Sequence, residues 1–322
     1  MRRPPRLPPM NSPSKHPNIF SGPYLDRSSH LRERADWLRE AGRDPQAQFV
    51  AVWQARNLFR RGDALATVLL ESSHAVVQAA NPDEMVFLGM FRGRASFLVE
   101  LQGEQAPEVD ADAEFRELRW LGAMLPSDEA GLLAYARALT LWRQRYRFCG
   151  VCGSRTRGAR GGHVLVCSNE SCKTEQFPRI DPAIIVLVSD GARALLGRQP
   201  SWPAGRYSTI AGFVEPGESL EDAVLREVHE ETGIRVHDVR YHSSQPWPFP
   251  SSLMLGFTAQ ALDSAIALKD GELEDARWFN RADIAAGAIA MPSSQSISFR
   301  LIEDWYDSGA GRPLRETPGV RL

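Results

Sequence analysis

The chain of 322 residues lacks any long hydrophobic run. No segment approaches the ~18 apolar residues that a membrane-spanning helix needs. A secretory signal is also missing, because the first 17 residues contain arginines and six prolines but no apolar core. We therefore expect a cytoplasmic protein without membrane contacts, in which residues 1–20 form a disordered lead-in.

A strong net charge is absent as well. The formal net charge is −2, with 43% hydrophobic and 24% charged residues, which is typical of a globular protein with no global attraction for nucleic acid. Acidic residues are missing between residues 130 and 169, where seven arginines occur: Arg137, Arg143, Arg145, Arg147, Arg155, Arg157 and Arg160. This basic stretch indicates either a solvated helix end or a surface that favours polyphosphate or RNA.

Cysteine is scarce, and all four cysteines lie in one window. They form two pairs, Cys149 with Cys152 and Cys167 with Cys172. This spacing predicts a four-cysteine zinc ribbon, although the second pair encloses four residues rather than two. Disulfides are the alternative, but without a secretion signal we expect a reducing compartment. Four thiolates leave no open position for water, so the predicted zinc is structural.

Carboxylates gather in the segment GFVEPGESLEDAVLREVHEETGI at residues 212–234. Glu227, Glu230 and Glu231 are spaced i, i+3 and i+4, so a helix would place them on one side. Adjacent like charges repel unless a cation offsets them, and hard oxygen ligands suit Mg²⁺ or Mn²⁺, which also bind substrate phosphates. A solvated acidic helix is the alternative interpretation.

The same segment matches the Nudix motif, G-x5-E-x7-R-E-U-x-E-E-x-G-U with U aliphatic, at every defined position. The matching residues are Gly212, Glu218, Arg226, Glu227, Val228, Glu230, Glu231, Gly233 and Ile234. So many fixed positions in one short window make a chance match rare. The chain resembles a Nudix hydrolase.

A second motif, SQPWPFPSS, occupies residues 244–252. Its three prolines stiffen the backbone and present Trp247 and Phe249, which could stack on a purine or nicotinamide ring or pack as a turn on the core. Combined with the Nudix motif and the cysteine ribbon, it resembles the NAD(H) diphosphatase family over residues 149–306. A weaker likeness extends to residues 115–119 and to the helix before Cys149.

This resemblance implies cleavage of the pyrophosphate of NAD(H) to AMP and nicotinamide mononucleotide. Removal of an NAD cap from RNA 5′ ends is a linked hypothesis. The implied ligands of Mg²⁺ or Mn²⁺ are the carbonyl of Ala211 and the carboxylates of Glu227, Glu230, Glu231 and Glu272. Glu274 and Asp275 lie close enough to leave the choice of Glu272 open.

The implied catalytic group comprises Arg226, Glu227, Glu230 and Glu231. Either Glu230 or Glu227 would activate the attacking water, and Arg226 would fix the rotamer of a neighbouring carboxylate. The implied substrate contacts are Arg119, Phe177, Phe213, Gln245, Pro246, Trp247, Pro248, Phe249, Pro250, Ser251 and Ser252. The last eight would contact the nicotinamide-ribose side, in a homodimer where one chain lends Trp247 to the other.

The predicted fold class is α+β. We expect an N-terminal α+β domain at 21–146, the zinc ribbon at 147–177, a Nudix α/β/α sandwich at 178–312 and a tail at 313–322. Predicted strands lie at 49–53, 66–70, 85–90, 95–101, 183–189, 193–198, 208–214, 239–244, 253–261 and 276–279. Predicted helices lie at 29–40, 113–124, 127–144 and 296–306, besides the acidic helix. The sequence contains no evident internal repeat.

Two alternative functions differ in substrate or in class. The chain could hydrolyse another nucleoside diphosphate derivative, such as ADP-ribose or a dinucleoside polyphosphate. It could also be a regulator whose Nudix domain senses nucleotides while the ribbon binds nucleic acid. The complete set of motif carboxylates argues against the regulator.

Overall fold

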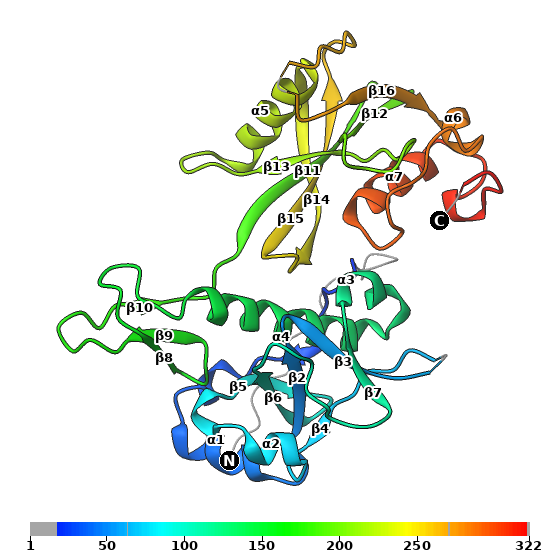
Figure 1. Cartoon of the computed structure of the whole chain (residues 1–322). Helices are drawn as coiled ribbons and strands as arrows, with labels where there is room; N and C mark the ends of the chain where they lie inside the picture. Colours follow the sequence, from blue (N-terminus) through cyan, green and yellow to red (C-terminus); the bar gives the residue numbers. More distant parts are fainter. Residues whose placement is uncertain (1–17, 63, 270, 321–322) are drawn as a thin grey trace, which may run out of the picture.

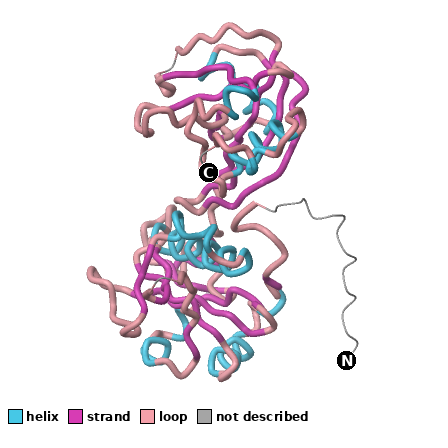
Figure 2. Tube along the Cα trace, turned by 90° about the vertical axis from the view of Figure 1, so that its right-hand side faces the viewer, coloured by secondary structure: helices cyan, strands magenta, loops and turns pink. Residues whose placement is uncertain are grey.

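The structure is a computed structural model that describes residues 18–62, 64–269 and 271–320. Most of the predicted disordered lead-in, 1–17, therefore lies outside the described residues. Residues 18–20 are placed, and Phe20 is buried. In the described part of the chain, no helix combines the length and apolar character needed to cross a membrane. Two α+β units lie one above the other, and a small three-stranded sheet projects beside them (Figure 1 and Figure 2).

The N-terminal unit is built on a seven-stranded sheet. Its strands are β1 (Leu25–Asp26), β2 (Gln48–Trp53), β3 (Arg56–Arg60), β4 (Leu70–Glu71), β5 (Val86–Phe91), β6 (Arg94–Leu101) and β7 (Ala113–Arg116). Its helices are η1 (Ser29–Leu31), α1 (Ala35–Arg43), α2 (Ala75–Ala79), η2 (Pro82–Glu84), α3 (Leu118–Leu121), η3 (Gly122–Met124) and α4 (Ser127–Arg145). The strand order is β1-β5-β6-β2-β3-β7, with β4 paired to β2.

The C-terminal unit is built on a six-stranded sheet. Its strands are β11 (Asp181–Ser189), β12 (Arg193–Arg198), β13 (Ile210–Phe213), β14 (Val236–Trp247), β15 (Ser252–Ala261) and β16 (Asp275–Asn280). Its helices are α5 (Leu220–Thr232), α6 (Arg281–Ala285), α7 (Ile297–Asp307) and η4 (Leu314–Glu316). The order is β14-β15-β11-β12-β16, with β13 paired to β11.

Alternation along the central strand of each unit creates two cores. Ile184 and Val186 of β11 pack with α5, whereas Ile185 and Leu187 pack with α7. Successive residues of a strand point to opposite faces, so one apolar run can serve both cores. The expected α/β/α sandwich is confirmed. Leu314 of the predicted tail is fully buried against the α7 side, so residues 314–316 pack as part of this unit.

The cysteine-bearing sheet consists of β8 (Thr156–Ala159), β9 (Val164–Cys167) and β10 (Glu175–Gln176), all antiparallel. It is attached to the N-terminal unit at β5. The amide of Phe87 donates to the carbonyl of Gly161 at 2.9 Å, and the carbonyl of Phe87 lies 2.7 Å from Nε2 of His163. These two contacts hold the cysteine-bearing sheet in one position on the N-terminal unit.

Most predicted elements are confirmed to within a few residues, but in the N-terminal unit three predictions need correction and one strand was missed. The predicted helix at 113–124 begins instead with β7, because residues 113–116 pair with β3. Strand β3 itself is absent from our predictions. The predicted strand at 66–70 yields only β4, which starts at Leu70. The predicted helix at 29–40 divides into η1 and α1. Pairing between segments far apart in the sequence determines the secondary structure of these regions, and the local residue pattern does not predict that pairing.

The two units follow one topology, although the sequence shows no repeat. The chain order is β2-β3-β4-α2-β5-β6-β7-α4 in the first unit and β11-β12-β13-α5-β14-β15-β16-α6-α7 in the second. The central strands pair in parallel with β6 and β15, respectively. The short strands β4 and β13 both pair antiparallel with the central strand. The N-terminal unit therefore has the same fold, with α2 at the position of α5.

Candidate active site

The acidic helix α5 is fixed at both ends by its own sequence. Ser219 caps its start, and the side chains of Ser219 and Asp222 form a reciprocal capping box. Gly233 ends it in the left-handed conformation, with φ of 72°. Ala223, Val224 and Val228 pack on the sheet. The helix therefore presents its carboxylates at a defined position and rotation.

The three glutamates divide between a buried and an exposed position. Glu227 and Glu231 are buried, with exposed fractions of 9% and 4%. The Glu230 side chain is 53% exposed. Spacing alone predicts all three on one side, and the structure places Glu230 at the rim of that side.

Strand β13 approaches the helix closely at Gly212. A Cβ atom on Gly212 would overlap the carboxylate of Glu227, so only glycine leaves room for this contact. Ala211 and Phe213 flank Gly212 on the same strand. The strand that carries Ala211 therefore lies against the carboxylate of Glu227 at Gly212, and the role of Ala211 as a metal ligand stays a prediction.

Arg226 joins three parts of the site. Its Nε donates to Glu218 at 2.6 Å, and its Nη1 donates to Glu227 at 2.9 Å and to Glu230 at 3.0 Å. Its Nη2 donates to the carbonyl of Phe213 at 2.9 Å. A planar guanidinium suits such divided bonding. Arg226 thus fixes the rotamers of Glu227 and Glu230, and it ties the helix to β13.

The electrostatics of the site favour a cation. Burial raises the pKa of Glu227; Arg226 opposes this, and the charges of Glu230 and Glu272 raise the pKa further. The influence of Glu272 puts its carboxylate near the site. Buried oxygen donors in mutual repulsion fit a divalent cation, which would offset both costs.

The neighbours of Glu272 have other partners. Glu274 forms an ion pair with Arg198, and Asp275 accepts a hydrogen bond from Tyr207 and pairs with Arg277 at 2.6 Å. Glu272 has an interaction of its own as well, so its choice as the distal ligand stays a prediction.

The four cysteines converge as predicted. Their Sγ atoms all lie within 4.8 Å of one another, and none forms a disulfide. The amides of Val151 and Asn169 donate to Cys149 and Cys167, each at 3.4 Å. Converging thiols with amide donors fit tetrahedral zinc.

Models of known protein families match three consecutive parts of this chain. The NUDIX domain model matches residues 179–298, the NADH pyrophosphatase zinc ribbon model matches 144–177, and the NADH pyrophosphatase-like rudimentary NUDIX model matches 46–142. NAD-capped RNA hydrolases from Macaca fascicularis and Mycobacterium bovis are 35% and 40% identical, over 89% of this chain and 73% and 96% of theirs. The chain belongs to the Nudix NAD(H) diphosphatase family. A third relative of the same description, from Stutzerimonas stutzeri, is 42% identical over 72% of this chain and 81% of its own.

In this Nudix protein the aromatic motif is the tip of the β14–β15 hairpin. Trp247 ends β14, Ser252 begins β15, and the rings of Trp247 and Phe249 lie 5.2 Å apart, edge to face. Pro246, Trp247, Pro248, Ser251 and Ser252 line a cavity of about 630 Å³ shared with α4, and Pro250 follows Phe249 in the turn. The motif is thus half buried between the units.

Gln245 does not lie with the other predicted substrate contacts. It is fully buried, its Nε2 donates to the carbonyl of Gln295 at 2.8 Å, and its Oε1 accepts from the amide of Ile297 at 2.9 Å. Protein groups therefore engage both the donor and the acceptor of this side chain. Phe177 and Phe213, by contrast, are 58% and 60% exposed.

Two arginines of the N-terminal unit contact the hairpin tip. The guanidinium of Arg137 donates to the carbonyl of Pro248 and lies 4.6 Å from the ring centre of Phe249. That of Arg119 lies 5.8 Å from the ring of Trp247 and 5.2 Å from the ring of Trp120. The sequence places Arg137 in a basic surface, but the structure buries it.

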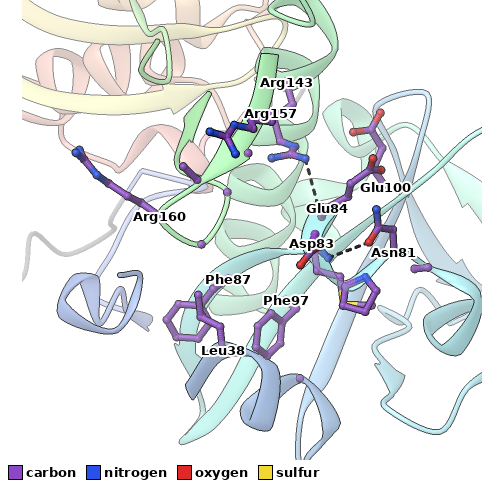
Figure 3. A pocket seen from close by; sticks show the side chains of 18 of the residues that line it. Leu38, Asn81, Asp83, Glu84, Phe87, Phe97, Glu100, Arg143, Arg157 and Arg160 are labelled. Carbon is purple, nitrogen blue, oxygen red and sulfur yellow. Dashed lines mark hydrogen bonds between the residues drawn. The ribbon is translucent and has the colours of Figure 1, made fainter. Parts of the chain in front are cut away.

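The rest of the basic stretch divides between two cavities. Arg145 lines the cavity beside the hairpin. Arg143, Arg147, Arg155, Arg157 and Arg160 line a separate cavity of about 1100 Å³ between the ribbon and the N-terminal unit. Arg32, Arg39 and Arg43 add to its wall, against the acids Glu33, Asp83, Glu84 and Glu100. Figure 3 shows Arg143 and Arg157 together above Glu84. The lining carries an excess of positive charge.

Proposed function

We propose that this protein hydrolyses the pyrophosphate of NAD(H) to AMP and nicotinamide mononucleotide. One observation carries the proposal: a complete Nudix carboxylate set, with Glu227 buried against Gly212 and clasped by Arg226, in a chain of the NAD(H) diphosphatase family. The printed names of the relatives describe hydrolases of NAD-capped RNA, which contains the same dinucleotide linkage.

Mg²⁺ or Mn²⁺ is the proposed catalytic cation, held by the carbonyl of Ala211 and by Glu227, Glu231 and Glu272. When bound, such an ion neutralises charge on the diphosphate and polarises the bond to be cleaved. Arg226 holds Glu227 in the rotamer that faces β13. Glu230, at the exposed rim and bonded to Arg226, is positioned to orient and deprotonate the attacking water.

The aromatic residues supply the proposed binding surface for the substrate rings. Phe177 and Phe213 expose ring faces that can stack on a planar ring. We place the nicotinamide-ribose side at the hairpin tip, where Arg119 and Trp247 lie together.

Incubation of the purified protein with NADH and Mn²⁺ tests the proposal directly. We expect AMP and nicotinamide mononucleotide in equal amounts and no turnover with a chelator. Parallel assays with ADP-ribose and dinucleoside polyphosphates compare kcat/KM among substrates. A higher kcat/KM for ADP-ribose would assign the protein to that alternative, and inactivity toward every substrate would favour the regulator.

A homodimer in which Trp247 serves the partner's site is also part of the proposal. Trp120, which is 64% exposed beside Arg119, offers apolar surface near the hairpin for such an interface. Light scattering should give twice the chain mass. Mixing inactive Glu231→Gln and Trp247→Ala proteins should restore activity, because one mixed site keeps both residues. No recovery in a mixture that forms heterodimers would contradict the shared site.

NAD-capped RNA is the second proposed substrate, and the arginine-lined cavity is a candidate for its phosphate backbone. Arg155 and Arg157 are exposed, whereas Arg143 is half-buried and donates to the carbonyl of Glu84 at 3.2 Å. The double change Arg155→Glu with Arg157→Glu therefore tests the cavity without disturbing the core. We expect KM for a short NAD-capped RNA to rise by about tenfold, with NADH kinetics unchanged.

The matched control reverses two other exposed arginines, Arg235→Glu and Arg240→Glu, which give the same change in net charge. Equal effects of the Arg155 and Arg157 changes on NADH and on capped RNA would show that the cavity is not an RNA site.

Zinc in the ribbon is expected at one ion per chain, which metal analysis of the purified protein measures. We also propose a cytoplasmic location, because zinc-binding thiols persist in a reducing compartment and none of the four cysteines is disulfide-bonded.

A further inference from the structure

Residues 18–20 cross from the N-terminal unit to the hairpin tip. Phe20 is 2% exposed, and its ring centre lies 6.2 Å from that of Trp247 and 5.8 Å from that of Phe249. In Figure 1 the dark blue start of the described chain passes beside the tip of the β14–β15 hairpin. The three rings form one aromatic cluster, although Phe20 lies more than 220 residues earlier in the sequence.

Hydrogen bonds fix the same segment to the strand that carries the motif. The side-chain amide of Asn18 donates to Oγ of Ser243 at 3.0 Å and to the carbonyl of Ser244 at 2.8 Å. The carbonyl of Ile19 accepts from Gln245 at 3.4 Å. Asn18 is only 8% exposed, so these bonds form out of water, where an unmade bond is costly. Residues 18–20 thus act as a strap across β14.

The strap is continuous with the active-site strand through buried polar side chains. Gln245 bonds the amide of Ile297, at the start of α7. The next residue, Ser298, accepts from the amide of Thr209 at 3.1 Å and from its hydroxyl at 2.9 Å. Thr209 immediately precedes β13, which carries the carbonyl of Ala211 and the ring of Phe213. One bonded path therefore links the hairpin tip to the metal-site strand.

We propose that residues 18–20 are a positioning element for the nicotinamide end of the substrate, with Phe20 as its central residue. This inference rests on the proposed function, because it assigns the hairpin tip to that end. The prolines of the hairpin restrict its backbone, but they do not fix the rings of Trp247 and Phe249. Phe20 packs against both rings and holds them in one arrangement before substrate binds, which lowers the entropic cost of binding.

The principal test is Phe20→Ala in the full chain. We expect KM for NADH to rise by about tenfold with kcat close to that of the wild type, because binding is weakened while the bond-breaking groups are untouched. Product inhibition locates the effect: the inhibition constant should rise for nicotinamide mononucleotide and stay constant for AMP. Phe20→Leu, which keeps an apolar contact, should recover part of the loss.

Gly122→Ala displaces Phe20 without changing it. A Cβ on Gly122 would lie 2.6 Å from two ring atoms of Phe20, whereas the backbone of Gly122, with φ of −55°, accepts alanine. The same rise in KM is expected. Gly42→Ala is the matched control, since its Cβ would meet only Phe97, at 3.9 Å. If Phe20→Ala does not fold, Gly122→Ala carries the test.

A general loss of stability would give a different result. Phe49→Ala removes an equally buried ring of the N-terminal sheet that does not touch the hairpin, so its melting temperature should fall with KM unchanged. Unchanged KM in Gly122→Ala and in any folded Phe20→Ala, with an active wild type, overturns the strap and leaves the proposed function intact. A wild type inert toward NADH overturns both.

Discussion

The two α+β units have one topology but differ where the chemistry lies. Between the short strand and the next long strand, the C-terminal unit has α5 with 13 residues, and the N-terminal unit has α2 with five. The sequence of α2, AVVQA, contains no carboxylate, and only Val77 is buried. The match of residues 46–142 to a rudimentary NUDIX domain agrees with this difference.

The comparison separates what the fold requires from what catalysis requires. In β2, Phe49 and Ala51 pack on one face of the sheet, while Val50 and Val52 pack on the other face with α4. The same alternation builds both faces around β11. Neither core uses the glutamates, so the N-terminal unit keeps its fold without them. Its contribution to the proposed substrate site is instead the contact of Arg119 and Arg137 with the hairpin tip.

The largest expected effect comes from removing one carboxylate from α5, since α2 contains none. Glu231→Gln removes a buried charge from the acidic face, and we expect kcat to fall by about 10²–10⁴-fold. The melting temperature should change little, because glutamine has the shape of glutamate and fills the same buried position. Steady-state kinetics and calorimetry measure both.

Glu221→Gln on the exposed first turn of the same helix is the control, with near-normal kcat. Near-normal turnover of the Glu231→Gln protein would mean that the carboxylate of Glu231 takes no part in catalysis.

A smaller effect is expected from Gly212→Ala, which tests the close approach of β13. The added Cβ would overlap the Glu227 carboxylate, so the side chain must leave its clasp with Arg226. We expect kcat to fall by about 10–100-fold, since a misplaced catalytic group costs rate without unfolding the sheet. Gly311→Ala, with open space around its Cβ, is the control. If Gly212→Ala matches its control, the contact is not needed for turnover.

The sequence predicts the arrangement of the glutamates and cysteines better than it predicts the contacts of the residues around them. The spacing of Glu227 and Glu231 gives their shared face because a helix relates them locally. The cysteine pairs converge through the antiparallel pairing of β8 with β9, which are also close in the sequence. Gln245, however, reads as a substrate contact until its buried partners, Gln295 and Ile297, are known. Its amide is satisfied by residues 50 and 52 positions away, and the local sequence does not predict this.

The N-terminal unit was the harder part to predict, for a related reason. Its strand β7 forms because residues 113–116 find β3, and Phe20 is buried because the hairpin tip reaches it. Both depend on contacts across long sequence separations. No periodicity marks residues 18–20, which follow a proline-rich segment and look like its continuation. The shared topology of the two units is also not evident from the sequence, because two segments can adopt the same strand order without having similar sequences.

The smallest expected effect concerns the ion pairs that attach α4 and α7 to the rest of their units. In the N-terminal unit the acid is at the start of the helix, where Asp128 of α4 pairs with Arg92 at 2.7 Å. In the C-terminal unit Asp304 lies in the last turn of α7, 2.6 Å from His242 of β14. An acid at a helix start is favoured by the helix dipole, whereas one near the end depends on its partner.

The hydrogen bond with His242 lowers the pKa of Asp304 below that of an ordinary aspartate. A carboxylate with a lowered pKa stabilises the fold fully above its unfolded-state pKa, and this stabilisation is lost as the pH falls through the folded-state value. Asp304→Asn should therefore lower the free energy of unfolding by about 0.5 kcal/mol at neutral pH, as for other ion pairs near the surface. Urea unfolding at a series of pH values should show this difference shrinking below about pH 4. Asp36→Asn in α1, whose side chain is 93% exposed, should change little at any pH. A difference between Asp304→Asn and the wild type that stays constant into acid would mean that packing, not the ion pair, ties α7 to its sheet.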